Sequence, residues 1–153
     1  MKIYTDGSAN PNPGPGGFGV LVLDNEEFFV YNIYTERSSK TTNNKEELKA
    51  ILYALKTYGV NIFNEEFADI PIVYSDSAYA INTYSDWMWR WANNDWKKSD
   101  NTTPENLDII MEYYNLWCEG YRIDLQKVKG HSNNKGNIIA DALAQGKLKE
   151  EFK

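Results

Sequence analysis

The chain has 153 residues, 42% of them hydrophobic and 25% charged, which suits one globular domain with a proper core. A single cysteine, Cys118, excludes a disulfide framework and a cysteine-rich zinc site, and it fits a reducing, cytoplasmic setting. No apolar run reaches the ~18–20 residues that a membrane span needs, so we expect no membrane association. The net charge of −6 by itself argues against a nucleic-acid partner, because phosphate binding usually leaves a basic footprint.

The N-terminal part is predicted to form three short strands in an antiparallel meander. Apolar runs of β type occupy residues 2–6, 18–23 and 27–35. The third run contains Phe28, Val30 and Ile33. Residues 10–17 concentrate Asn, Pro and Gly, which predicts an irregular loop between the first two strands.

A helix is predicted next. Asn43 is the expected N-cap, with Glu46 three residues later at the spacing of a capping box. Apolar residues follow at helical spacing, at Leu48, Ile51, Leu52 and Leu55. Gly59 is the expected stop.

The rest of the chain alternates strands with helices. Strands are predicted over residues 70–75 and 122–128, and helical segments over 77–96, 105–119 and 137–149. Strands first and helix–strand alternation afterwards indicate an α/β domain. We expect a five-stranded mixed sheet, its first three strands antiparallel, flanked by helices.

Three aspartates stand out by their positions. Asp6 and Asp76 each close an apolar strand, and Asp141 lies inside the last helix between apolar pairs. A strand-end aspartate is, taken alone, more often an ordinary cap than a ligand. A carboxylate at the core-facing position predicted for Asp141 is unusual unless it is paired or binds metal.

Helix geometry separates the neighbouring Glu46 and Glu47. At about 100° per residue, Glu46 is expected roughly 170° from the centre of the apolar stripe, in water, as the capping residue. Glu47 is expected roughly 90° from the centre, where a side chain can reach a neighbouring sheet. Glu47 is therefore the functional candidate of the two.

Five short motifs carry a resemblance to a known family. They are TDGS at residues 5–8, NPGPGG at 12–17, TTNNKEEL at 41–48, SDS at 75–77 and VKGH at 128–131. Asp141 follows ten residues after the histidine. Together these residues resemble type 1 ribonuclease H, in its stand-alone bacterial form. The motifs occur in the order of that family and extend over nearly the whole chain. The resemblance implies the ribonuclease H-like fold and a single catalytic domain over residues 1–153, without a separate hybrid-binding domain.

The same resemblance implies a metal-dependent endoribonuclease. It would hydrolyse the RNA strand of RNA–DNA hybrids, leaving 5′-phosphate and 3′-hydroxyl products. The implied catalytic and metal-binding carboxylates are Asp6, Glu47, Asp76 and Asp141, with His131 as a mobile histidine beside them that moves protons and binds no metal. Four oxygen ligands favour two Mg²⁺ ions, with Mn²⁺ as a substitute, over zinc.

The resemblance also implies substrate contacts. They are Gly7, Ser8, Asn12, Thr42, Asn43 and Asn44 near the grooves and phosphates, and Trp87, Trp91 and Trp96 on a protrusion. Ala78 stands where the family often has glutamine, so one contact is missing or supplied elsewhere. Near Trp91, residues 87–100 carry three basic and two acidic side chains, which predicts a weak electrostatic hold on a hybrid. We expect a monomer.

Other functions fit parts of the sequence. A retroviral-type ribonuclease H domain or a transposase core would share the superfold, but each usually stands beside further domains. A non-catalytic hybrid-binding protein would be expected to lack at least one carboxylate. A metal-binding module unrelated to nucleic acid suits the acidic charge, yet it leaves the Asn- and Gly-rich motifs unexplained.

Overall fold

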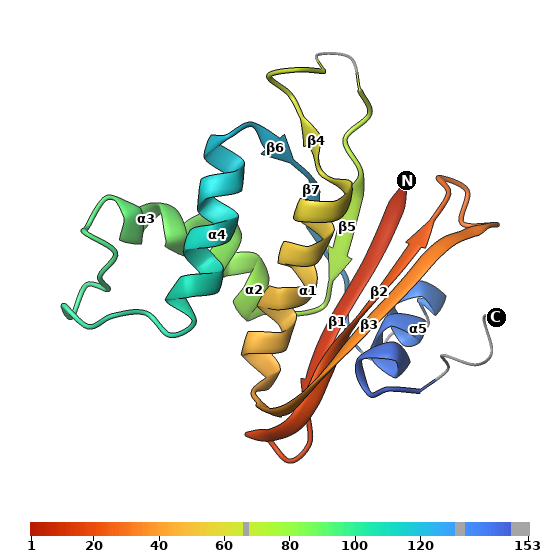
Figure 1. Ribbon diagram of the computed structural model, residues 1–153, viewed down its shortest axis with the longest axis horizontal. Coiled ribbons are helices and arrows are strands. Elements are labelled where there is room, and N and C mark those ends of the chain that lie inside the picture. The colour runs from red at the N-terminus through yellow and green to blue at the C-terminus, as the bar shows by residue number, and fades with distance from the viewer. Residues whose placement is uncertain (66–67, 131–133, 148–153) are drawn as a thin grey trace.

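The computed structural model describes residues 1–65, 68–130 and 134–147, and these form a five-stranded mixed sheet with helices on both faces (Figure 1). The strands are β1 (Lys2–Ala9), β2 (Gly14–Leu23), β3 (Val30–Thr41), β5 (Ile72–Ser75) and β7 (Asp124–Lys127). Their order is β3-β2-β1-β5-β7, with β1, β2 and β3 antiparallel and β5 and β7 parallel to β1. The predicted fold class is confirmed.

The helices divide between the two faces of the sheet (Figure 1). They are α1 (Asn43–Tyr58), α2 (Ala78–Asn82), the π-helical turn η1 (Thr83–Trp87), α3 (Met88–Ala92), α4 (Leu107–Cys118) and α5 (Lys135–Ala144). Side-chain alternation sends Ile3 into the core under α1 and α4, and the next residue, Tyr4, into a smaller core under α5. No helix of the described residues is long and apolar enough to cross a membrane.

Several boundaries differ from the sequence prediction. The first strand continues past residue 6 to Ala9, and the second begins at Gly14, so the irregular loop predicted over residues 10–17 is reduced to residues 10–13. The third strand begins at Val30 and runs to Thr41, whereas Phe28 is 80% exposed in the turn before it. The predicted strand over 122–128 is divided, because β6 (Tyr121–Arg122) pairs instead with β4 (Val60–Asn61) in a separate small sheet. The last helix starts two residues early, at Lys135, and the end predicted for it lies outside the described residues.

Two glycines allow helices to approach the central strands. A Cβ added at Gly7 would lie 2.4 Å from the backbone of Glu46 and Glu47, so α1 can reach β1 only where the strand has no side chain. A Cβ at Gly19 would lie 2.4 Å from the Cβ of Leu143 in α5. Gly19 pairs with Asp6 across β1 and β2, so both helices meet the sheet beside this aspartate.

Candidate active site

Three carboxylates from separate elements converge at one edge of the sheet. Asp6 lies within β1 and not at its predicted end, Asp76 directly follows β5, and Glu47 lies in the first turns of α1. Each offers a ligand oxygen, and these oxygens all lie within 4.8 Å of one another. The two aspartates meet because β1 and β5 are parallel neighbours, so their carboxyl ends point to the same edge.

Two of the three carboxylates are buried, the third, Asp76, is half-buried, and their charges repel one another. Asp6 is 4% exposed and Glu47 is 6% exposed. Burial raises the pKa of Asp6, and the carboxylates of Glu47, Asp141 and Asp76 raise it further. Burial also raises the pKa of Glu47, against hydrogen bonds that lower it. Three carboxylates this close repel one another unless protons or cations intervene.

The donor set fits a hard divalent cation. The Oε2 atom of Glu47 is buried and has no hydrogen-bond partner among the described residues. An unsatisfied buried carboxylate oxygen is costly, and it faces two further oxygen donors of the kind that Mg²⁺ and Mn²⁺ prefer. Asp6, Glu47 and Asp76 could therefore hold a metal ion.

The fourth predicted carboxylate, Asp141, lies at the rim of this cluster. It is outside the set whose oxygens lie within 4.8 Å, yet it is close enough to raise the pKa of Asp6. The expectation that Asp141 faces the core is wrong: its side chain is exposed and accepts a hydrogen bond from Gln145 Nε2 at 3.1 Å. Ala140 and Leu143 supply the buried face of α5 instead.

His131 lies outside the described residues. The preceding residue, Gly130, is described, and a Cβ added there would lie 3.4 Å from Asp76 Oδ2. The described part of this loop therefore reaches the carboxylate cluster.

Glu46 does not point into water, so its predicted position is wrong. It is 0% exposed, accepts a hydrogen bond from Thr41 Oγ1 at 2.9 Å, and pairs with Lys49 at 3.0 Å. The helix-face arithmetic considered only the core under α1. The first turn of α1 is also covered by the end of β3 and by β1 at Gly7, so its outer side is buried as well.

The cap of α1 is Thr42 and not the predicted Asn43, because the Thr42 side chain accepts from Lys45 N at 3.1 Å. Asn43 Oδ1 instead accepts from Ala9 N at 2.6 Å, and Asn12 Oδ1 accepts from Asn43 N at 3.2 Å. These bonds tie the NPGPGG loop to the start of α1. Asn44 is exposed beside them.

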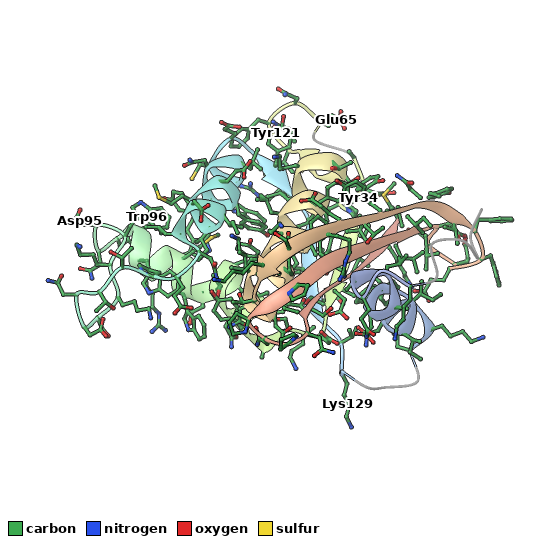
Figure 2. All side chains as sticks on the ribbon, turned by 60° about the horizontal axis from the view of Figure 1, so that its bottom comes forward. Tyr34, Glu65, Asp95, Trp96, Tyr121 and Lys129 are labelled. Carbon is green, nitrogen blue, oxygen red and sulfur yellow. The ribbon has the colours of Figure 1, made fainter. Side chains whose placement is uncertain are left out.

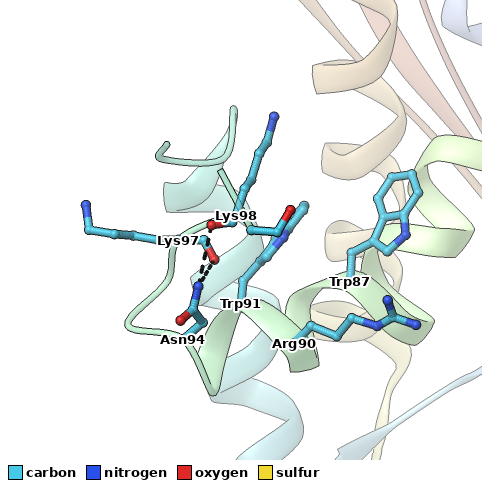
Figure 3. A pocket seen from close by; sticks show the side chains of 7 residues that line it. Trp87, Arg90, Trp91, Asn94, Lys97 and Lys98 are labelled. Carbon is cyan, nitrogen blue, oxygen red and sulfur yellow. Dashed lines mark hydrogen bonds between the residues drawn. The ribbon is translucent and has the colours of Figure 1, made fainter. Parts of the chain in front are cut away.

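The predicted tryptophans extend from the sheet on three successive segments: Trp87 ends η1, Trp91 lies in α3, and Trp96 lies in the loop that follows. Figure 2 shows Asp95 and Trp96 at one end of the molecule. Trp87 and Trp91 line a pocket of about 500 Å³ together with Arg90, Asn94, Lys97, Lys98 and Ser99 (Figure 3). Trp96 instead packs edge-on against Tyr114, with ring centroids 5.0 Å apart. Trp91 also packs against the main core, as Trp96 does, so it belongs to both the pocket and the core.

Sequence reasoning missed two groups of side chains. Lys49, three residues after Glu46, was a detectable signal that Glu46 has a partner. Arg37 and Lys147, by contrast, are far apart in the chain and share one pocket with Ser8 beside the carboxylates. No local pattern indicates that pair.

Comparisons with known proteins agree on one family. Residues 1–149 match the RNase H family model. The Ribonuclease H of Caldanaerobacter subterraneus is 37% identical, covering 100% of this chain and 94% of that protein, and the one of Rickettsia felis is 38% identical, covering 94% and 88%. Among solved structures, LC11-RNase H1 in complex with an RNA/DNA hybrid has a TM-score of 0.65 at 22% identity, covering 99% of each chain. The PFV RNase H domain has a TM-score of 0.73 at 21% identity, covering 95% of this chain and 92% of that one. The chain therefore belongs to the ribonuclease H family.

Proposed function

We propose that this protein is a metal-dependent endoribonuclease that hydrolyses the RNA strand of RNA–DNA hybrids. The observation that carries the proposal is the convergence of Asp6, Glu47 and Asp76, with ligand oxygens within 4.8 Å of one another. Membership of the ribonuclease H family and the fold shared with a hybrid-bound relative support the substrate. The expected products carry a 5′-phosphate and a 3′-hydroxyl.

Asp6, Glu47 and Asp76 would hold the cations, with Asp141 completing the set from the exposed rim. When bound there, two Mg²⁺ ions would supply the Lewis acidity that activation of a water and charge on a leaving 3′-oxygen require. The protein supplies placement: β1, β5 and α1 are fixed by the sheet and by the Gly7 contact. His131 is proposed to transfer a proton at the leaving group, because an imidazole can both take up and release protons near neutral pH.

Recognition of RNA would rest on short polar groups beside the cluster. The 2′-hydroxyl lies in a shallow minor groove that such groups can read. The side-chain carbonyls of Asn12 and Asn43 are occupied by backbone N–H groups, so their amide N–H groups remain as donors. Together with Asn44 and the Gly7-Ser8 backbone, they form the proposed groove contact. Thr42 is proposed to bind a DNA phosphate, and Trp87 and Trp91 to stack on the DNA strand.

One assay tests the proposal. Labelled RNA–DNA hybrid, duplex RNA and duplex DNA are each incubated with the protein, with and without Mg²⁺. Cleavage of only the RNA strand of the hybrid, and only with Mg²⁺, is the expected result. Hybrid binding without cleavage would support a binding protein instead. Metal binding without any effect on the three nucleic acids would support an unrelated metal-binding module.

A further inference from the structure

A polar pocket lies next to the carboxylate cluster, on the α5 side of the sheet. Its volume is about 440 Å³. It is formed by the ends of β1 and β2, the middle of β3 and the turn after α5, and its lining residues are Ser8, Asn10, Pro15, Gly16, Arg37, Gln145 and Lys147. This is a different pocket from the tryptophan pocket of Figure 3.

The charge of this pocket has one sign. Arg37 and Lys147 are its charged lining residues, and no carboxylate lines it. Neither residue forms an ion pair within the part of the chain that the structure describes. In a protein with a net charge of −6, a pocket with two cations and no acid is a local site for an anion.

Arg37 is held in position by the end of α5. Its Nη1 donates to the carbonyl oxygen of Ala144 at 2.5 Å, and Ser8 Oγ contacts the same oxygen at 3.5 Å. In the strand register, Gly17 lies between Ser8 and Arg37 and has no side chain to fill the gap. A guanidinium has five N–H donors, so the bond to Ala144 leaves others for a ligand.

The pocket adjoins the proposed reaction centre on two sides. Ser8 follows Asp6 by two residues on the same face of β1, a distance of about 7 Å. Gln145 both lines the pocket and donates to Asp141. Arg37 Nη1 and Ser8 Oγ meet at the same Ala144 carbonyl oxygen, so the guanidinium reaches back across Gly17 to the Ser8 end of the pocket. The step from Asp6 to Ser8 is of the order of the spacing between successive phosphates of one nucleic-acid strand.

We propose that Arg37 and Lys147 bind a backbone phosphate of the RNA strand, adjacent to the phosphate that is cleaved. This inference rests on the proposed function. It assigns a phosphate contact to this pocket, although the net negative charge of the protein argues against phosphate binding. A planar guanidinium and a mobile ammonium are both suited to phosphate oxygens. The two residues act in substrate binding and take no part in the chemical step.

The first experiment measures hybrid affinity over a salt series, with Ca²⁺ in place of Mg²⁺ to prevent turnover. The variants are Arg37→Gln and Lys147→Gln. The control is Lys56→Gln on α1, which removes the same charge from an exposed ion pair with Glu112 of α4. Each pocket variant is expected to reduce the log–log salt slope by about one unit and to weaken binding roughly tenfold at low salt. The Lys147 side chain makes no hydrogen bond within the described residues, so its loss does not threaten folding.

A second experiment identifies the phosphate. A single neutral methylphosphonate is moved along each strand of the hybrid. At one RNA-strand position next to the cleavage site, it should weaken binding by the wild type but not by Lys147→Gln. Two results would overturn the pocket proposal alone, provided that the wild type still cleaves the hybrid. In one, the methylphosphonate whose effect disappears in Lys147→Gln lies on the DNA strand. In the other, the pocket variants bind the hybrid in the same way as Lys56→Gln. A wild type that neither binds nor cleaves hybrid would overturn the proposed function and this proposal with it.

Discussion

The carboxylate edge of the sheet and the tryptophan protrusion are built in opposite ways. The edge places Asp6 and Glu47 on a strand and a helix whose approach is set by Gly7, and both side chains are buried. The protrusion places the exposed Arg90 on α3, and the half-buried Lys97 and Lys98 on a loop where Asp95 and Trp96 adopt positive φ angles of 54° and 59°. A central strand and a long helix hold the groups proposed for chemistry, whereas short helical segments and a loop hold the groups proposed for hybrid binding.

The difference shows how much displacement of its side chains each region tolerates. Repelling carboxylates need positions fixed within fractions of an ångström, and only packed backbone provides this. A stacking and phosphate-binding surface tolerates more movement, because stacking depends little on sequence or exact register. Substitutions at the edge should therefore affect turnover, and substitutions in the protrusion should affect affinity.

The largest effect is expected at the edge. Glu47→Gln or Asp6→Asn should lower kcat by at least ~10³-fold, because each removes a metal-binding oxygen. Without metal, Asp6→Asn should melt at the same or a higher temperature, since it relieves repulsion. The pKa of Asp6 is raised in the folded state. The metal-free wild type should therefore lose stability as the pH rises above the pKa that this carboxyl has in the unfolded chain. Asp6→Asn has no such carboxyl and should lose less stability over the same pH range. Single-turnover kinetics measures the loss of rate, and thermal melts over a pH series measure the stability. An Asp6→Asn variant that melts at a lower temperature than the metal-free wild type would contradict the repulsion between clustered carboxylates.

The neighbouring Glu46 is buried like Glu47, but its contacts are structural, so its substitution should affect stability and not turnover. Glu46→Ala leaves Lys49 and Thr41 without their partner, and it should destabilise the protein by roughly 1–3 kcal/mol. Glu46→Gln keeps an acceptor for Thr41 and should cost less. Urea unfolding measures both, with kcat of the folded fraction as the second readout. A variant at Glu46 that folds normally but does not turn over would show that the two glutamates have exchanged roles.

Substitutions of the protrusion tryptophans should differ in whether they change KM or the free energy of unfolding. Trp87→Ala and Trp91→Ala remove pocket-lining rings, and each should raise KM by about tenfold with little change in kcat. Trp96→Ala removes the ring packed on Tyr114, and it should mainly lower the unfolding free energy, by about 1–3 kcal/mol. Equal KM effects for Trp87 and Trp96 would contradict the division seen in the structure.

The smallest effect concerns added charge on the protrusion. Asn93→Lys should lower KM a few-fold and steepen the log–log salt slope by about one unit, because the position is exposed. Asn94→Lys is the matched control, since Asn94 Nδ2 donates to the carbonyls of Lys97 and Lys98 and its loss loosens the pocket (Figure 3). Asp95 is a poor site for the same change because of its positive φ. A salt slope that stays the same in Asn93→Lys would show that position 93 does not meet a phosphate of the hybrid.

Much of the fold could be predicted from local patterns. The apolar stripe of Leu48, Ile51 and Leu55 identified α1, and the alternation of elements indicated the mixed sheet. Boundaries were less accurate where tertiary pairing decides them. Phe28 belongs by propensity to a strand, yet β3 starts later because its partners on β2 begin at Leu23 opposite Val30. The π-helical turn at Thr83–Trp87 had no sequence signal that we recognise.

The sequence by itself determined the main strands of the large sheet, the long helices and the family motifs, because periodicity, turn residues and short motifs are local properties of a chain. It also marked Asp6, Glu47 and Asp76 as candidates through their places at strand ends and on a helix flank. Only the tertiary structure decided that Glu46 is buried and Asp141 exposed, and that Arg37 and Lys147 share a pocket. Burial and convergence depend on which distant segments cover a residue, and here the contacts at Gly7 and Gly19 set that covering.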